Sequence, residues 1–320
     1  MKAIIVREFG AAEVMKLEEI ETPEPHENQV LVRIKAAGVN PVDTYIRAGS
    51  YAQKPDLPYT PGKDGAGIVE KTGANVTKFK PGDRVLTADA GSGTYAEFAV
   101  FDEKHLIKLP ENISFEQGAG VFVPFATAYR ALFQKAQGKT GETVLIHGAS
   151  GGVGVAAIQW AKNAGLEVIG TASSDEGKKL VTEQGADFVV DHSDENYLSE
   201  ILEITNGKGV EIILEMLANV NLQKDFDVLA RFGRVSIVGN RGSLEFNPRA
   251  IMGKDASVFG LSLFNAPDAD MNEIHTAIYD GLNKGFLKPI VGKTFSLENA
   301  VEAHRAVIEE KAFGKIVLTI

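Results

Sequence analysis

The sequence predicts an α/β protein in which a doubly wound parallel sheet is accompanied by a second, β-rich domain. Three observations lead to this prediction: evenly spaced apolar strands in the middle of the chain, a glycine-rich turn after the first of them, and frequent turn signals in the first 110 or so residues. The chain has 320 residues. At roughly 100–200 residues per domain, this length predicts two domains, with three as the alternative.

The first part of the chain is expected to form a small twisted barrel or an irregular sheet. Short strand-like segments alternate there with turn signals such as Pro61-Gly62 and Pro81-Gly82. The expected strands are Met1–Val6, Val30–Ala36, Gly65–Lys71, Asp83–Leu86 and Tyr95–Val100.

The middle of the chain contains five short apolar segments rich in Val and Ile. They are Thr143–His147, Glu167–Gly170, Asp187–Val190, Val210–Leu214 and Arg234–Gly239. Their centres, near 144, 168, 188, 212 and 235, are 20–24 residues apart, which fits one strand plus one helix each. Nearly continuous apolar strands are typical of a parallel sheet covered on both faces. The single Trp160 lies on the apolar face of the helix after the first strand and is predicted to be core.

The end of the chain returns to mixed structure. Ser296 is a candidate cap for a helix whose apolar face includes His304, which we expect to be a core or boundary histidine. Gly314–Ile320 is expected to close the chain as a strand.

Composition and charge exclude several kinds of protein. The chain has no cysteine, which excludes disulfide scaffolds, cysteine zinc sites, iron–sulfur clusters and a cysteine nucleophile. Its 33 Lys and Arg against 43 Asp and Glu give a net charge of −10, which disfavours nonspecific nucleic-acid binding. Met1–Glu8 lacks the pattern of a signal peptide, and no stretch approaches the ~18 apolar residues that span a bilayer. We therefore expect a cytoplasmic protein.

The strongest local motif is His147–Gly154, a glycine-rich turn between an apolar strand and a helix. Glycine permits the tight turn and allows backbone amides to approach a pyrophosphate, and the helix start offers free N–H groups. The spacing Gly148, Gly151, Gly154 departs from the strict G-x-G-x-x-G form. An ordinary tight turn is the alternative, but the regular strand spacing favours a dinucleotide site.

The end of the second strand favours NADPH over NADH. NAD-selective sites place an acid at this position to bind the ribose 2′-hydroxyl, whereas here the strand is followed by Ser173 and Ser174. These serines, together with Lys178 and with His192 after the third strand, are candidates to bind a 2′-phosphate. The alternative is that the serines cap the next helix and that Lys178 is merely solvated.

Six motifs along the chain resemble one family. They are Gly38–Val42, Thr44–Arg47, Pro58–Gly62, His147–Gly154, Glu215–Leu222 and Gly239–Gly242. Over essentially its whole length the sequence resembles the zeta-crystallin-like NADPH:quinone oxidoreductases, in the zinc-free branch of the medium-chain dehydrogenase/reductase superfamily. The resemblance implies a GroES-like catalytic domain made of 1–123 and 265–320 around a Rossmann NADPH-binding domain at 124–264, with the cofactor in the cleft between them.

The resemblance also implies that both zinc sites of the family's alcohol dehydrogenases are absent. Asn40 stands where their first zinc-binding cysteine would be, and Lys63-Asp64 replaces their His-Glu pair. Zinc acts as a Lewis acid on alcohols and carbonyls. A quinone is already a strong electron acceptor and depends less on such an ion.

By the same resemblance, Tyr45 and Asn40 line the nicotinamide pocket and act as hydrogen-bond donors that orient the ligand. The alternatives are that Asn40 caps a backbone turn and that Tyr45 is a half-buried packing residue. Ser173 departs from the family, which has glycine there, and Arg241 is either a phosphate contact or an exposed, salt-bridging residue. The residues expected to bind the cofactor are Tyr45, Ser150, Gly151, Gly152, Val153, Ser173, Ser174, Lys178, His192, Asn221, Val238, Gly239, Asn240, Arg241, Leu261, Ser262 and Leu263.

The expected activity is NADPH-dependent reduction of quinones, ortho-quinones in particular, by hydride or one-electron transfer. One alternative is an NADPH-dependent reductase of enal or enone double bonds. An alternative from another class is an NADPH-sensitive RNA-binding protein or a structural protein of the crystallin type. A homo-oligomer, dimer or tetramer, is implied by the resemblance and could form through the strand around Ser257–Leu263.

Overall fold

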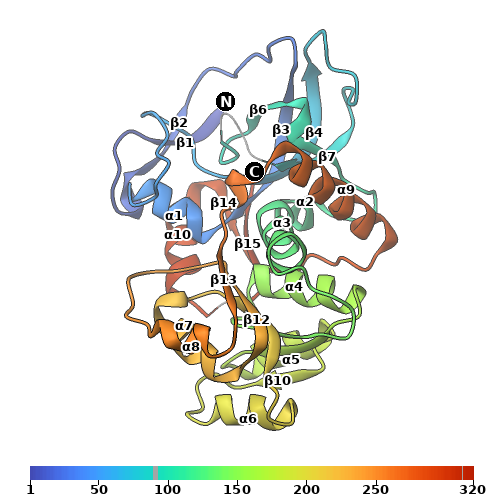
Figure 1. Cartoon of the computed structure of the whole chain (residues 1–320). Helices are drawn as coiled ribbons and strands as arrows, with labels where there is room; N and C mark the ends of the chain where they lie inside the picture. Colours follow the sequence, from blue (N-terminus) through green and yellow to red (C-terminus); the bar gives the residue numbers. More distant parts are fainter. Residues whose placement is uncertain (89–92, 312) are drawn as a thin grey trace. The chain divides into compact units, whose positions relative to one another are not determined.

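The computed structural model describes residues 1–88, 93–311 and 313–320. The chain divides into two compact units. Figure 1 shows the whole chain coloured along its sequence. We call Met1–Val123 with Pro289–Ile320 the β-rich unit, and Pro124–Lys288 the α/β unit. Within the ranges described, no helix is long and apolar enough to cross a membrane.

The β-rich unit contains a sheet in the order β14-β15-β3-β4-β5-β7, with β6 also paired to β3, and a separate β1-β2 ribbon. Its strands are β1 (Lys2–Val6), β2 (Met15–Glu19), β3 (Gln29–Val39), β4 (Asp64–Thr72), β5 (Arg84–Ala88), β6 (Phe98–Asp102), β7 (Leu106–Lys108), β14 (Val291–Ser296) and β15 (Lys315–Thr319). Its helical segments include α1 (Pro41–Arg47), α2 (Phe115–Ala119) and α10 (Ala300–Glu309). The strands predicted in the first 110 residues are present, except that the one expected at Tyr95–Val100 begins only at Phe98.

The end of the chain joins strands from its first part in this sheet. The last strand, β15, runs antiparallel to β3, with Ile316 opposite Val39 and Leu318 opposite Ala37. The predicted terminal strand is thereby confirmed. The predicted helix before it is also present. Ser296 is the N-cap of a 3-10 turn (Leu297–Asn299) that leads directly into α10, although its side chain makes no capping hydrogen bond.

The α/β unit is a parallel sheet in the order β10-β9-β8-β11-β12-β13. Its strands are β8 (Thr143–Ile146), β9 (Glu167–Thr171), β10 (Phe188–Val190), β11 (Val210–Glu215), β12 (Leu229–Ile237) and β13 (Ser257–Gly260). Its helices are α3 (Phe122–Tyr129, which starts in the β-rich unit), a π-helical segment (Arg130–Lys135), α4 (Gly152–Asn163), α5 (Asp175–Glu183), α6 (Tyr197–Ile204), α7 (Ala218–Val228), α8 (Pro248–Met252) and α9 (Asp268–Lys284). The strand order reverses between β8 and β11, as the predicted doubly wound Rossmann sheet requires.

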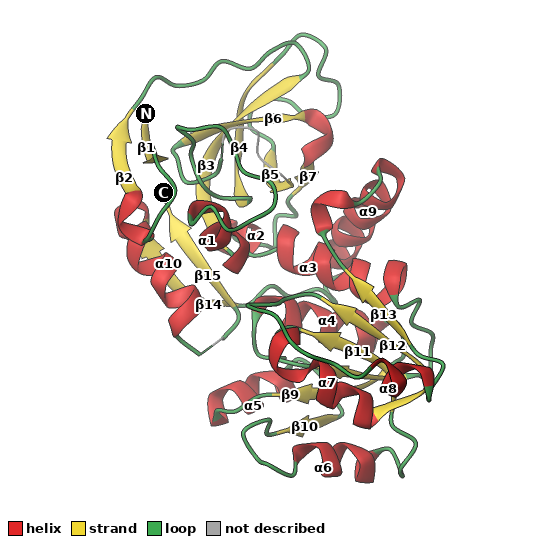
Figure 2. Ribbon diagram, turned by 60° about the vertical axis from the view of Figure 1, so that its left-hand side comes forward, coloured by secondary structure: helices red, strands yellow, loops and turns green. Residues whose placement is uncertain are grey.

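Helices cover both faces of this sheet (Figure 2). A Cβ on Gly170 of β9 would lie 2.5 Å from Val181 of α5, whereas the neighbouring Ile169 belongs to the core under α6 and α7. Adjacent strand residues point to opposite faces, so these helices lie on opposite sides.

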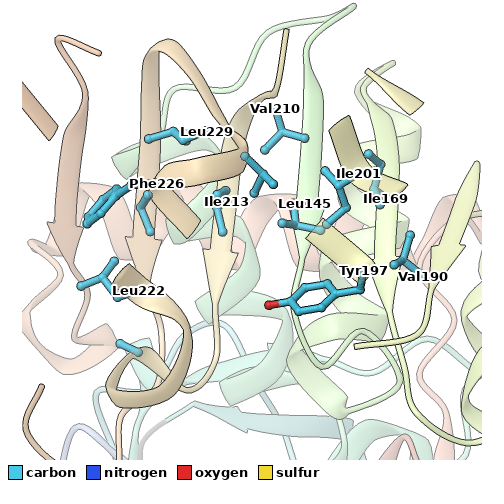
Figure 3. Packing of buried hydrophobic residues seen from close by; sticks show 13 residues of the cluster. Leu145, Ile169, Val190, Tyr197, Ile201, Val210, Ile213, Leu222, Phe226 and Leu229 are labelled. Atoms are coloured by element: carbon cyan, nitrogen blue, oxygen red, sulfur yellow. The ribbon is translucent and has the colours of Figure 1, made fainter. Parts of the chain in front are cut away.

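The core under α6 and α7 is drawn in Figure 3, and its members are almost completely buried. They include Leu145, Ile169, Val190, Tyr197, Ile201, Val210, Ile213, Leu222, Phe226 and Leu229. Each such apolar side chain stabilises the fold by roughly 1.5–3 kcal/mol on burial. The predicted core role of Trp160 is confirmed, since it is 4% exposed and its Nε1 donates to the Phe125 carbonyl at 3.1 Å.

The segment 265–288 packs within the α/β unit, although the sequence assigned it to the returning part of the other domain. Arg130 donates to the Asp270 carboxylate of α9 at 2.9 Å, and the rings of Phe286 and Trp160 meet edge to face at 5.6 Å. The sequence pattern of a helix does not show which core the helix packs against. The boundary predicted at residue 264 therefore differs from the boundary of the compact unit at Lys288. The assignment of catalytic and NADPH-binding roles to these domains stays a prediction, with the bounds 1–123, 124–264 and 265–320.

Candidate active site

The glycine-rich turn connects the end of β8 to the start of α4. Gly148 has a φ of 54°, in the left-handed region that favours glycine. A Cβ on Gly154 would lie 2.5 Å from the Ala149 backbone, so no larger residue fits there. Helix geometry leaves the first-turn N–H groups of Gly152 and Val153 without partners inside α4, at the positive end of its dipole. These features fit the pyrophosphate of a dinucleotide.

The end of β9 lies beside this turn. Ser174 is the N-cap of α5 and its hydroxyl accepts a hydrogen bond from the Gly177 N–H at 3.1 Å. A Cβ on Gly177 would lie 3.0 Å from Ser174 Oγ and 3.3 Å from Ser150 Oγ, so both hydroxyls flank the same residue. The structure thus brings Ser150 and Ser174 together, and it confirms the capping alternative for Ser174.

Lys178 is paired rather than merely solvated. Its Nζ lies 2.6 Å from Asp191 Oδ2, with the two side chains 35% and 30% exposed. The hydrogen bond with Asp191 raises the pKa of Lys178, and the ammonium lowers the pKa of Asp191. The next residue, His192, places its Nδ1 3.3 Å from Thr171 Oγ1 at the end of β9.

The loops after β11 and β12 are joined by reciprocal hydrogen bonds. The Asn219 N–H donates to Asn240 Oδ1 at 3.0 Å, and the Arg241 N–H donates to Asn219 Oδ1 at 2.9 Å. A Cβ on Gly239 would lie 2.3 Å from the Met216 carbonyl oxygen, so glycine permits the close approach. Arg241 itself is exposed.

The predicted cofactor residues of the α/β unit mostly follow the carboxyl ends of its strands. These ends meet at one edge of a parallel sheet, where open α/β folds bind ligands. The residues there are Ser150 after β8, Ser173 after β9, His192 after β10, Asn221 after β11, Val238 after β12 and Leu261–Leu263 after β13.

Asn40 in the β-rich unit belongs to a buried polar network. Its Nδ2 donates to Asp64 Oδ2 at 3.0 Å, and its Oδ1 accepts a hydrogen bond from Lys315 Nζ. Lys315 Nζ also lies 2.8 Å from Asp64 Oδ2, and Asp64 Oδ1 accepts from the Val123 N–H at 2.8 Å. Asn40, Asp64 and Lys315 are 3%, 0% and 5% exposed. Both amide atoms of Asn40 therefore already have protein partners.

The same network anchors the helix that carries Tyr45. The Asp43 carboxylate accepts from the Asn40 N–H at 2.9 Å at the start of α1, and burial raises the pKa of Asp43 to about 7. Tyr45 is half-buried on this helix. His304 is the expected core histidine, with Nε2 3.1 Å from Tyr95 Oη and a pKa lowered by burial to about 3.

The donor set around Asn40 does not fit a zinc ion. Structural and catalytic zinc sites use Cys, His and carboxylate ligands, whereas this position has an amide, a carboxylate and the Lys315 ammonium. The positive charge that balances Asp64 comes from lysine.

Sequence reasoning missed two sets of residues. Lys315 is 251 positions away from Asp64, so no local pattern connects them. His147, Glu215 and Asp225 form the one group of three metal-type side chains found in the described part of the chain. The adjacent motifs contained His147 and Glu215, but nothing in them indicated Asp225 of α7.

Comparisons with known proteins agree with this arrangement. The alcohol dehydrogenase GroES-like domain family matches residues 26–111, and the zinc-binding dehydrogenase family matches residues 152–278. The human quinone oxidoreductase is 48% identical, with 100% of this chain and 98% of the relative covered. The quinone oxidoreductase of Pseudomonas aeruginosa is 35% identical, with 99% of each covered.

A solved structure extends the comparison to three dimensions. The Escherichia coli quinone oxidoreductase complexed with NADPH is 31% identical and superimposes with a TM-score of 0.91, with 100% of both chains covered. Its similarity extends over both units. With nearly half of its residues identical to the human enzyme over its full length, the chain belongs to the quinone oxidoreductase family of the medium-chain dehydrogenase/reductase superfamily.

Proposed function

We propose that this protein reduces quinones with NADPH and without zinc. The observation that carries the proposal is the full-length similarity to quinone oxidoreductases, including one whose structure contains NADPH. The double-bond reductase alternative has weaker support, since a 2-haloacrylate reductase of a Burkholderia species is 30% identical, against 48% for the human quinone oxidoreductase. The RNA-binding or structural roles rest on the family resemblance alone.

The proposed cofactor site is the edge of the sheet in the α/β unit. The first-turn N–H groups of α4 would hold the pyrophosphate, with Ser150 beside them. Ser173, Ser174, Lys178 and His192 would surround the 2′-phosphate, where NAD-selective sites carry an acid. Asn221, Val238–Arg241 and Leu261–Leu263 would contact the riboses and the nicotinamide.

The two residues expected to be catalytic have different proposed roles. When bound, the reduced nicotinamide supplies the electrons. Tyr45 would orient the quinone through its hydroxyl, because its half-buried side chain projects from α1. Asn40 would act as a positioning residue, since its amide binds Asp64 and Lys315 and so fixes the start of the same helix.

The reaction is proposed to need no metal ion. The protein chemistry at Asn40 does not fit zinc, and a quinone requires little Lewis-acid activation. Chelator-treated protein should therefore keep its activity.

The test is the oxidation of NADPH and NADH by purified, chelator-treated protein, first with an ortho-quinone and then with an enal. We expect quinone-dependent turnover, faster with NADPH, and unchanged by the chelator. Turnover with the enal alone would replace the proposed substrate, and loss of activity in chelator with recovery on zinc would refute the zinc-free chemistry. Tight NADPH binding without turnover would favour a binding or structural role.

The assembly and location of the protein remain predictions. A homo-oligomer, dimer or tetramer, would use the edge strand β13, which has one neighbour in the described sheet. RNA binding is a secondary prediction. Salt-sensitive binding of RNA that NADPH displaces would support it. A cytoplasmic location is also expected.

A further inference from the structure

One methionine stands directly beside the glycine-rich turn. Strands β8 and β11 are parallel neighbours with Leu214 opposite Ile146, and the His147 N–H donates to the Leu214 carbonyl at 3.1 Å. Two residues further along each strand, the same register brings Met216 opposite Gly148. A Cβ on Gly148 would lie 3.8 Å from Met216 Cγ and 3.9 Å from Met216 Cβ, and apart from its chain neighbours no other described residue comes within 4 Å. Met216 therefore bounds the open side of the turn.

Hydrogen bonds on both sides of Met216 fix its backbone. The Gly239 N–H donates to the Glu215 carbonyl at 3.2 Å, and the Ala218 N–H donates to the Gly239 carbonyl at 3.0 Å. The residues before and after Met216 are thus held against the loop that follows β12. The backbone of Met216 stays beside the turn, and only rotation about its own side-chain bonds can move the thioether.

The carboxyl ends of β8 and β11 form the switch point of the sheet. These are the two neighbouring strands between which the strand order reverses, and open α/β sheets bind ligands in the crevice at that point. The proposed function assigns Ser150, Asn221 and Gly239 to the cofactor but gives Met216 no role. A dinucleotide that reaches the first-turn N–H groups of α4 through this crevice would pass the Met216 side chain.

Methionine is the only residue type of this chain with an oxidisable sulfur, since the sequence has five methionines and no cysteine. Met15 is 3% exposed, whereas Met252 on α8 is 71% exposed. Met216 is half-buried, as are Met1 before β1 and Met271 on α9. Among the exposed and half-buried methionines, Met216 is the one that lies beside the glycine-rich turn.

Hydrogen peroxide oxidises a thioether without any further reactant. A lone pair of the sulfur attacks one peroxide oxygen, the O–O bond breaks, and the second oxygen leaves as water after proton transfer. The sulfur loses two electrons and the peroxide gains them. The product, methionine sulfoxide, is polar where methionine is apolar, and methionine sulfoxide reductases reverse the step.

A sulfoxide beside Gly148 would oppose an anionic ligand. The turn and the start of α4 attract phosphate through free N–H groups and the positive end of the helix dipole. The sulfoxide oxygen carries partial negative charge, so it would compete for these N–H groups and repel phosphate oxygens. The unmodified thioether is a weak acceptor and does neither to a comparable extent.

We propose that Met216 is an oxidation site, and that its conversion to the sulfoxide by hydrogen peroxide lowers the affinity of the cofactor site for the dinucleotide. This inference rests on the proposed function for the identity of the ligand. Reduced quinones pass electrons to oxygen and thereby form peroxide, so the oxidant is a by-product of the proposed reaction. The modification then acts as a reversible brake on the use of NADPH.

Mass spectrometry of peroxide-treated protein tests the site itself. We expect sulfoxide at both Met216 and Met252. Bound NADP⁺ should slow the oxidation of Met216 several-fold and leave that of Met252 unchanged, because the ligand covers only the first of them. An absence of sulfoxide at Met216, or equal rates with and without NADP⁺, would overturn the proposal.

The Kd for NADPH is then compared before and after oxidation, once the peroxide has been removed. Oxidation should raise the Kd of the parent protein by about tenfold, and sulfoxide reductase should restore it. M216L cannot form a sulfoxide and should keep the Kd that it had before treatment. M252L, the matched control, should respond like the parent. Complete oxidation of Met216 without a change in Kd, or an equal rise in M216L, would contradict the proposal.

A polar substitution separates the oxidation of Met216 from other effects of peroxide. M216Q introduces a polar side chain of similar length and should weaken NADPH binding without any treatment, whereas M252Q should not. Circular dichroism and thermal melting check that the variants fold. If M216Q binds NADPH as tightly as M216L, polarity at this position does not govern binding and the inference is wrong.

These readouts measure binding rather than turnover, which separates the inference from the proposed function. Tight NADPH binding without quinone reduction would refute the proposed reaction and leave the effect of Met216 oxidation measurable. Untreated protein that binds no NADPH would overturn both the cofactor assignment and the inference built on it.

Discussion

The ammonium of Lys178 lies 2.6 Å from Asp191 Oδ2, and this pair connects α5 with the end of β10. Asp191 is further held by the Ser193 N–H at 2.9 Å. A 2′-phosphate at the end of β9 would therefore meet a lysine that already has an anionic partner. The preference for NADPH over NADH then depends on whether the Lys178 ammonium pairs with the 2′-phosphate or stays with the Asp191 carboxylate.

Lys178→Ala should weaken NADPH binding by about tenfold and NADH binding much less, because a charge-assisted hydrogen bond to the 2′-phosphate is lost. The measurement is the Kd for both cofactors by fluorescence titration. Lys179→Ala is the matched control, since Lys179 is exposed and paired with Glu183. Equal losses for both cofactors would show that another group binds the phosphate.

Asp191→Asn tests the competing partner. Removal of the carboxylate frees Lys178 and removes repulsion, so NADPH binding should strengthen by several-fold while NADH binding changes little. A weaker NADPH complex would mean that Asp191 positions Lys178 rather than competing for it.

Gly152→Val should abolish NADPH binding in a folded protein. The branched side chain would cover the first-turn N–H groups of α4, which the pyrophosphate must reach. Cofactor titration measures the loss, and circular dichroism with thermal melting checks the fold. Unchanged NADPH affinity in the folded variant would overturn the assignment of the loop.

Lys315→Met should destabilise the protein by about 3–5 kcal/mol, because it leaves Asp64 as a buried charge without its cation. Urea denaturation measures the change. Lys293→Met, which removes an exposed pair with Glu310, should cost less than about 1 kcal/mol. Combining Lys315→Met with Asp64→Asn should recover part of the loss, and full additivity would contradict a coupled pair.

Asp43→Asn should flatten the dependence of stability on pH. Burial raises the pKa of Asp43 from 3.8 to about 7, so between about pH 4 and 7 the folded state holds a proton that the unfolded state has released. Stability therefore falls as the pH rises through this window, and the asparagine variant lacks that contribution. Denaturation at several pH values tests it; identical slopes in both proteins would show that Asp43 ionises normally.

Local patterns predicted much of the fold. The Val- and Ile-rich segments and their 20–24-residue spacing predicted β8 to β12, because parallel strands buried on both faces need nearly continuous apolar sequence. The turn at Gly148–Gly154 was also predictable from the sequence. The left-handed φ of Gly148 and the close backbone approach at Gly154 both require glycine. β12 begins at Leu229 rather than near 234, and β14 was missed because its sequence, Val291–Ser296, has little apolar content.

The sequence by itself therefore determined the doubly wound sheet, the position of the glycine-rich turn and the family to which the chain belongs. Only the tertiary structure decided that Lys315 neutralises Asp64, that Lys178 is paired with Asp191 and that Asp225 faces Glu215 and His147. The physical reason is that backbone conformation depends on neighbouring residues, whereas the ionisation and partners of a buried group depend on side chains that folding brings together from distant parts of the chain.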